Sequence, residues 1–172
     1  LSFPTGAPIQ AKQTEQITAT LNLDARVADA TSVTPKTPRA TYGTSINVYD
    51  TQGVAIPINL YFVKNGSNNW DVYTTLDETL QPDGSQVGTV LFDGSGVYDP
   101  SNTPIDLDMS QPYIVSPNPN NPPNPPGTPW NVRLDLSDCT QFGSKFAVAD
   151  LTQNGYASGD LTSINISNDG MV

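Results

Sequence analysis

Proline and glycine interrupt this sequence so often that long regular elements are excluded. The 172 residues include 16 Pro and 13 Gly, and no helical hydrophobic period is sustained. Between the interruptions apolar and polar residues alternate, as in Ile17–Leu23 and Trp130–Leu136. A period of two is typical of strands with one buried face. The sequence therefore predicts an all-β fold, an antiparallel β-sandwich or flattened β-barrel of roughly eight to ten short strands.

The clearest predicted hairpin lies between residues 44 and 74. Thr44–Tyr49 and Ala55–Lys64 are strand-like, and Asp50–Gly53 between them is a turn whose glycine can take a positive φ. A third strand, Trp70–Thr74, follows a second turn and completes a three-stranded meander. Pro57 has no N–H to donate, so that end of its strand is expected at a sheet edge or a bulge.

The remaining predicted strands are short and flanked by turn residues. They are Val87–Phe92, Gly96–Tyr98, Ile105–Met109, Phe146–Leu151 and Asp160–Ser167, together with the two alternating segments above. Residues 24–43 contain two prolines and predict a long surface loop. The segment 116–129 (SPNPNNPPNPPGTP) predicts a long Pro-rich loop with extended backbone.

The composition excludes several classes of function. The chain has no histidine, which removes Ser-His-Asp and Cys-His nucleophile systems and any His-ligated metal. Its one cysteine, Cys139, allows no internal disulfide or Cys-based zinc site, and is expected to be a small, partly buried hydrophobe. The net charge is −10 and the seven basic residues are scattered, so neither nucleic acid nor a membrane is an expected partner. No apolar run is long enough for a membrane helix.

The composition leaves carboxylate, Lys or Tyr chemistry for catalysis. Asp106 and Asp108 share one face of a predicted strand and could bind calcium with Asn102 or Ser110, but a solvated strand face is favoured. Two turns, Asp50–Gly53 and 93–96 (DGSG), superficially resemble an aspartic-protease signature without matching it, and turn chemistry explains both. We therefore expect no enzyme activity, no catalytic or metal-binding residues, and no cofactor.

Aromatic residues offer a second alternative, a sugar-stacking platform. Six side chains could contribute to it: Tyr61, Trp70, Tyr73, Tyr98, Tyr113 and Trp130. Because Trp70 and Trp130 each begin an alternating strand with apolar neighbours on the same face, a position in the core is favoured for both.

Two motif-bearing stretches resemble the bacterial flagellar hook protein family. Residues 44–74 match its segment VYD-x-x-G … YFVK … W-x-VY, with Val48-Tyr49-Asp50, Gly53, Tyr61–Lys64, Trp70, Val72 and Tyr73. Residues 151–172 are similar to the ending Q-[ND]-G-Y-x-x-G-x-L. A weaker likeness covers Ile17–Leu23. Distal-rod proteins share these motifs, so the resemblance covers the hook and distal-rod family together.

The resemblance implies a domain organisation and a mechanical role. Residues 1–16 are expected to be a connector strand to an inner domain absent from this chain, 17–167 an outer β-domain with a variable insert at 77–129, and 168–172 a returning connector. Copies of the parent subunit would polymerise into the curved hook tube outside the cell, which transmits motor torque to the filament. The isolated fragment is expected to be monomeric. The alternative is a secreted adhesin-like or carbohydrate-binding β-sandwich.

Overall fold

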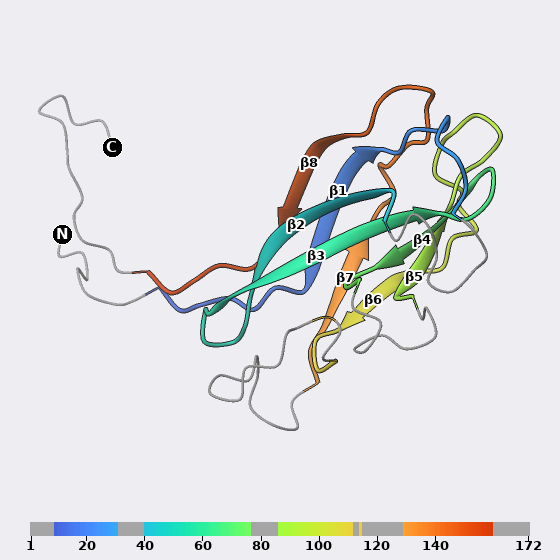
Figure 1. Cartoon of the computed structure of the whole chain (residues 1–172). Coiled ribbons are helices and arrows are strands. Elements are labelled where there is room, and N and C mark those ends of the chain that lie inside the picture. Colours follow the sequence, from blue (N-terminus) through green and yellow to red (C-terminus); the bar gives the residue numbers. More distant parts are fainter. Residues whose placement is uncertain (1–8, 31–39, 77–85, 112–113, 115–128, 160–172) are drawn as a thin grey trace, which may run out of the picture.

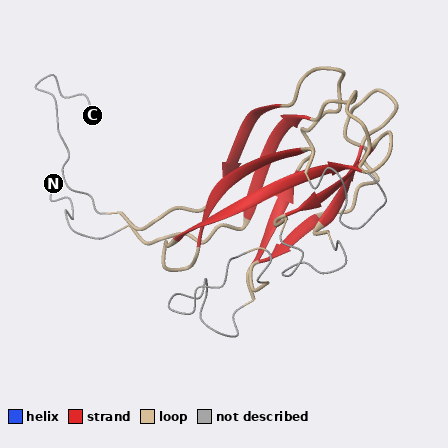
Figure 2. Ribbon diagram, in the orientation of Figure 1, coloured by secondary structure: helices blue, strands red, loops and turns tan. Residues whose placement is uncertain are grey.

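The computed structural model describes residues 9–30, 40–76, 86–111, 114 and 129–159. Within these residues the regular structure is entirely strand, arranged as two four-stranded sheets that face each other (Figures 1 and 2). The predicted all-β fold is confirmed, and of the two predicted architectures the chain adopts the sandwich.

One sheet is a continuous antiparallel meander. It contains β2 (Tyr42–Tyr49), β3 (Ala55–Lys64), β4 (Asn69–Tyr73) and β5 (Gly88–Leu91), in that spatial order. The predicted three-stranded unit is therefore present, with β5 added. Pro57 lies opposite Asn47 of β2, whereas β4 pairs only with the far end of β3, from Tyr61 to Lys64. The proline thus occupies a part of β3 with a described strand on one side only, as its missing N–H requires.

The second sheet has the order β6-β7-β1-β8 and mixes strand directions. It contains β1 (Gln16–Asn22), β6 (Ile105–Asp108), β7 (Asn131–Asp135) and β8 (Ala147–Gln153). The strands β1 and β7 run parallel, so the prediction of antiparallel strands throughout is wrong for this pair. Only strands joined by a tight hairpin must be antiparallel. Because the whole meander sheet lies between β1 and β7 in the sequence, no hairpin fixes their direction.

The core forms where the inward-facing residues of the two sheets meet. On β1 every second residue is buried, from Ile17 to Leu21, and β3 alternates in the same way from Ile56 to Phe62. Trp70 and Trp130 are 0% and 4% exposed, so both belong to the core. Each large apolar side chain removed from water contributes about 1.5–3 kcal/mol. The period-two pattern in the sequence therefore marks the residues that hold the sheets together.

The two open sides of the sandwich are closed differently. On one side Gly88 of β5 lies against Ile105 of β6, where a β-carbon on the glycine would come within 2.5 Å of Ile105 Cγ1. On the other side the ring of Tyr42 at the start of β2 stacks on Phe146, just before β8, with a centroid distance of 4.4 Å. A small residue thus admits close approach on one side, and an aromatic pair spans the gap on the other.

One predicted strand is not formed, and two other predicted segments lie wholly or almost wholly outside the described residues. Gly96–Tyr98 is not a named strand, because its residues make only the isolated bridges Phe92–Tyr98 and Val97–Thr140. The predicted strand Asp160–Ser167 lies outside the described residues, as does almost all of the Pro-rich segment 116–129.

Candidate functional site: the stem and its junction with the sandwich

The chain enters and leaves the sandwich at one end, through two segments that run side by side (Figure 1). We call residues 9–12 and 156–159 the stem. Ile9 and Gly159 exchange backbone hydrogen bonds of 2.6 and 3.0 Å, and Lys12 and Tyr156 exchange two of 2.9 Å. The stem is therefore a two-stranded antiparallel ribbon.

Thr14 connects the stem to both sheets. Its side chain is fully buried, and its Oγ1 accepts a hydrogen bond from the Tyr49 amide (2.9 Å) and donates one to Gln153 Oε1 (2.8 Å). Its carbonyl oxygen accepts the indole N–H of Trp130 at 2.7 Å. Tyr49 ends β2, Gln153 ends β8 and Trp130 precedes β7. One threonine thus fixes the base of the stem to three separate strands.

Asn154 and Gly155 complete this junction from the other strand of the stem. The Oδ1 atom of Asn154 accepts hydrogen bonds from the amides of Glu15 (2.9 Å) and Gln16 (3.1 Å). Gly155 lies so close to Thr14 that an added β-carbon would overlap the Thr14 hydroxyl oxygen. The sequence predicts turn chemistry at Asn154-Gly155. The structure shows that Asn154 also satisfies backbone donors where β1 and β8 give way to the stem, and that Gly155 makes room for Thr14.

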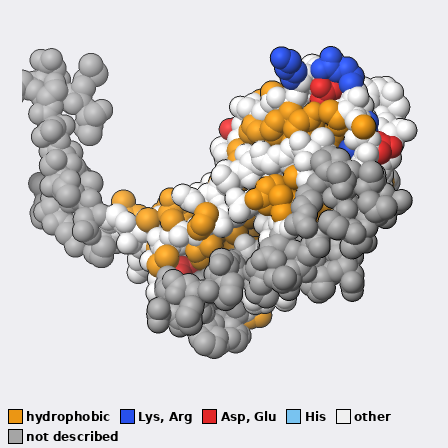
Figure 3. All heavy atoms as spheres, in the orientation of Figure 1, with side chains coloured by type: hydrophobic (Ala, Val, Ile, Leu, Met, Phe, Trp, Pro, Cys, Tyr) orange, Lys and Arg blue, Asp and Glu red, His pale blue; other side chains and the backbone are white. Residues whose placement is uncertain are grey.

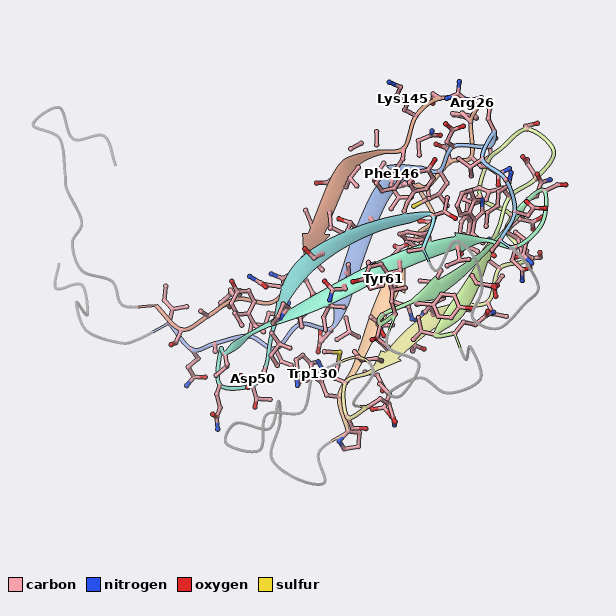
Figure 4. The ribbon with its side chains drawn as sticks, in the orientation of Figure 1. Arg26, Asp50, Tyr61, Trp130, Lys145 and Phe146 are labelled. Carbon is pink, nitrogen blue, oxygen red and sulfur yellow. The ribbon has the colours of Figure 1, made fainter. Side chains whose placement is uncertain are left out.

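The β2–β3 turn, Asp50–Gly53, lies against the stem (Figure 4). Asp50 Oδ1 accepts hydrogen bonds from the amides of Gln52 (2.8 Å) and Val54 (2.9 Å), and Gly53 has a φ of 80°. A β-carbon at Gly53 would lie 2.8 Å from the β-carbon of Ala11 and 3.0 Å from the amide nitrogen of Ser158. The predicted turn is confirmed, and the glycine is required both by its φ and by its contact with both strands of the stem.

A second turn repeats this geometry far along the chain. Asp93 Oδ1 accepts from the amides of Ser95 (2.8 Å) and Val97 (3.0 Å), and Gly96 also has a φ of 80°. Both Asp-to-Gly segments are therefore Asp-capped turns, which is the structural explanation preferred over a protease signature. The second turn packs on the backbone of Gln141 instead of the stem.

The candidate calcium ligands have other partners. Asp106 forms an ion pair with Arg133, its neighbour across β6 and β7. Hydrogen bonds from Gln111 and Ser110 lower the pKa of Asp108. The side chain of Asn102 is bonded to the backbone of Leu91. Throughout the described part of the chain, no three His, Cys, Asp or Glu side chains gather as a metal site would require.

The described members of the candidate aromatic platform do not form one exposed surface. Trp70, Trp130 and Tyr73 are buried, and the indole N–H of Trp70 donates to Gln141 Oε1 at 2.6 Å inside the protein. Tyr61 and Tyr98 are only partly exposed, and Tyr113 lies outside the described residues. The core positions predicted for the two tryptophans are confirmed.

Cys139 is buried, and this burial raises the pKa of its thiol to about 12. Its Sγ donates a hydrogen bond of 3.2 Å to the carbonyl oxygen of Ala19. A thiol with this pKa is overwhelmingly protonated at neutral pH, and the thiolate is the nucleophilic form. The structure thus confirms the predicted apolar role.

The structural role of Lys64 was not predicted from the sequence. Its Nζ is buried at the end of β3 and donates to the carbonyl oxygens of Ala25 (2.7 Å) and Val27 (2.8 Å). These bonds fasten the start of the loop that follows β1. The sequence did contain a signal for this role, because Lys64 ends the apolar run Tyr61–Lys64. A charged group buried there is costly unless it has hydrogen-bond partners.

Among the described residues, no helix is long and apolar enough to span a bilayer. In a comparison with known families, a family model described as the flagellar basal body protein FlaE D2 domain matches residues 22–156. That range contains all of β2 to β8 and lies between the two strands of the stem, apart from Tyr156.

The individual relatives that match this chain include flagellar hook proteins. The flagellar hook protein of Escherichia coli is 33% identical over 130 residues, which is 74% of this chain and 29% of the relative. The flagellar hook protein of Salmonella typhimurium is 30% identical over 130 residues, which again is 74% of this chain and 29% of the relative. The chain thus spans less than a third of each relative. A solved 32 kDa fragment of the hook protein from Caulobacter crescentus is 19% identical, with a TM-score of 0.46, covering 69% of this chain and 48% of the fragment.

Proposed function

The chain belongs to the flagellar basal body protein FlaE D2 domain family, and from that membership we propose that it is an outer domain of a flagellar hook subunit. The observation that carries this proposal is the stem. A domain inserted within a longer subunit is joined to it by both of its ends, and here both ends of the described sandwich leave it together, as a hydrogen-bonded pair.

In this proposal the parent subunits polymerise into a short curved tube outside the cell, which bends while passing motor torque to the filament. The outer domains contact copies of themselves in neighbouring subunits. Contacts that break and re-form with each turn must be modest and polar. The acidic composition supports this, since the net charge is −10. On the face shown in Figure 3, the visible Lys and Arg side chains lie on the sandwich, away from the stem.

The domain boundaries follow the same proposal. Residues 1–16 lead from an inner domain, 17–167 form the outer domain with its variable insert at 77–129, and 168–172 return toward the inner domain. No catalytic step, cofactor, nucleic acid or membrane contact belongs to this function. The isolated chain is monomeric, because the polymer forms through the whole subunit. Light scattering at micromolar concentration checks this, and a polymer mass would contradict it.

The adhesin-like or carbohydrate-binding alternative has no support from the comparisons, in which the relatives are named as flagellar hook proteins. Its aromatic platform would need exposed, coplanar rings, whereas Trp70 and Trp130 are in the core.

Immunogold labelling of intact cells tests the proposed function. Antibodies raised against this chain should label the short curved segment between the cell body and the filament. Cells lacking the gene serve as the control. Label spread over the cell surface, or confined to material released from the cells, would contradict the proposal.

A further inference from the structure

The stem is too small to remain ordered by its own hydrogen bonds. Its two described strands exchange four backbone hydrogen bonds, two at Ile9–Gly159 and two at Lys12–Tyr156. An isolated two-stranded ribbon is marginally stable at best in water. Two of its larger apolar side chains, Ile9 and Tyr156, are 54% and 47% exposed and therefore add little burial. Something outside the ribbon must hold it in place.

The Asp50–Gly53 turn supplies that support. The three atoms nearest to a β-carbon built on Gly53 belong to the stem: Ala11 Cβ at 2.8 Å, Ser158 N at 3.0 Å and Ala157 Cα at 3.1 Å. They come from both strands of the ribbon, between its two bridged pairs. The turn is itself rigid, because Asp50 caps two of its amides. We propose that Gly53 positions the stem: its missing side chain lets a rigid turn contact both strands, and this contact sets the direction in which the stem leaves the sandwich.

The turn also acts through the base of the stem. Thr14 and Tyr49 are joined by two hydrogen bonds of 2.9 Å, and Tyr49 immediately precedes Asp50. The first strand of the stem is therefore held at Thr14 and supported again three residues earlier, at Ala11. Two points of contact fix a direction, whereas one would leave the ribbon free to swing. The stem and sandwich consequently move as one body. The inference goes beyond the proposed hook role and depends only on contacts within this chain.

Amide hydrogen exchange measured by NMR on the whole 172-residue chain tests it. Gly53→Ala adds a methyl group where the turn packs closely on the stem. Overpacking of this kind is expected to shift the local opening equilibrium of the stem toward the open state by roughly ten- to hundredfold. The exchange rates of the four ribbon amides, Ile9, Lys12, Tyr156 and Gly159, should rise by that factor relative to the amide of Met109, which is bonded inside the sandwich.

Three variants separate positioning from general destabilisation. Gly66→Ala is the matched control, since Gly66 also has a positive φ (114°) but its β-carbon would meet only Asn69 Cβ at 3.8 Å. It should leave ribbon exchange unchanged relative to Met109. Ala11→Val enlarges the side chain on the stem side of the same contact and leaves the backbone of the turn unaltered. It should raise the exchange rates of the ribbon amides, and it provides this test even if Gly53→Ala fails to fold. Adding Ala11→Gly to Gly53→Ala removes the nearest clashing atom and should restore at least part of the lost protection, a coupling expected only of residues in contact.

The inference is overturned if ribbon exchange stays unchanged in both Gly53→Ala and Ala11→Val. It is equally overturned if Gly66→Ala raises ribbon exchange as much as they do, or if Ala11→Gly restores no protection in the Gly53→Ala background.

Discussion

The indole N–H of Trp70 donates a 2.6 Å hydrogen bond to the side-chain oxygen of Gln141, and both residues are buried. Trp70 belongs to β4 of the meander sheet, whereas Gln141 follows a segment that pairs with the end of β1. The Gln141 amide group also donates to the carbonyl oxygen of Ser67 and to Asn68 Oδ1, at 3.0 and 3.1 Å. This glutamine joins the meander sheet to the segment between β7 and β8.

Gln141→Ala should therefore destabilise the fold by about 1–3 kcal/mol, because it leaves the buried indole N–H of Trp70 without an acceptor. Urea denaturation followed by tryptophan fluorescence measures the loss. Gln52→Ala, at an exposed position of the β2–β3 turn, is the control and should change stability by less than about 0.5 kcal/mol. Equal effects of the two substitutions would show that the bond between the sheets contributes nothing.

Lys64→Met should destabilise the chain by about 1–3 kcal/mol, although methionine fits an apolar site, because the carbonyl oxygens of Ala25 and Val27 lose their donor. Thermal unfolding followed by circular dichroism gives the value. Lys145→Met removes the same charge at an exposed position and should be nearly neutral. If the two lysine variants unfold at the same temperature, the buried ammonium group is not holding the loop.

Thr14→Val should cost about 1–3 kcal/mol, because a nearly isosteric side chain leaves the Tyr49 amide without its acceptor in a buried site. Thr14→Ser keeps the hydroxyl group and should recover most of this loss. Chemical denaturation of the three proteins provides the comparison. A serine variant as unstable as the valine variant would show that the methyl group, and not the hydroxyl, matters at the junction.

The stability of the chain should fall in acid, in part through Asp24. The hydrogen bonds from Arg26 lower the pKa of this carboxyl group to about 2. Because the folded-state pKa lies below the unfolded value, the contribution is fully present above pH of about 4 and is lost as the pH falls toward 2. Melting temperatures measured across this range should decline less steeply for Asp24→Asn and for Arg26→Gln. An unchanged slope in both variants would contradict the pairing.

The strands could be predicted from the sequence because each depends on neighbouring residues. The alternation in Ile17–Leu23 identifies the buried face of β1, and the Asp50–Gly53 turn signal places the β2–β3 hairpin with the observed bounds of β3. The parallel pairing of β1 with β7 could not be predicted in this way. It arises between strands more than a hundred residues apart, whose relative direction no local turn determines.

In the candidate site, the local turn residues could be predicted from the sequence, but their contacts with distant residues could not. Gly53 and Gly155 are recognisable as turn residues, because local backbone geometry demands glycine or favours it. Their contacts with Ala11 and Thr14 join opposite ends of the sequence and emerge only once the fold brings both ends together. Lys64 was missed because a lysine at the end of a strand is usually solvated, and its carbonyl partners lie in a loop without a regular pattern.

A cryo-electron microscopy reconstruction of the hook from cells that carry this gene tests the central claim most directly. The account predicts the two four-stranded sheets on the outer surface of the tube, with the paired segments 9–12 and 156–159 directed toward the tube axis. A sandwich that faces the lumen, or a hook whose density contains no such domain, would contradict it.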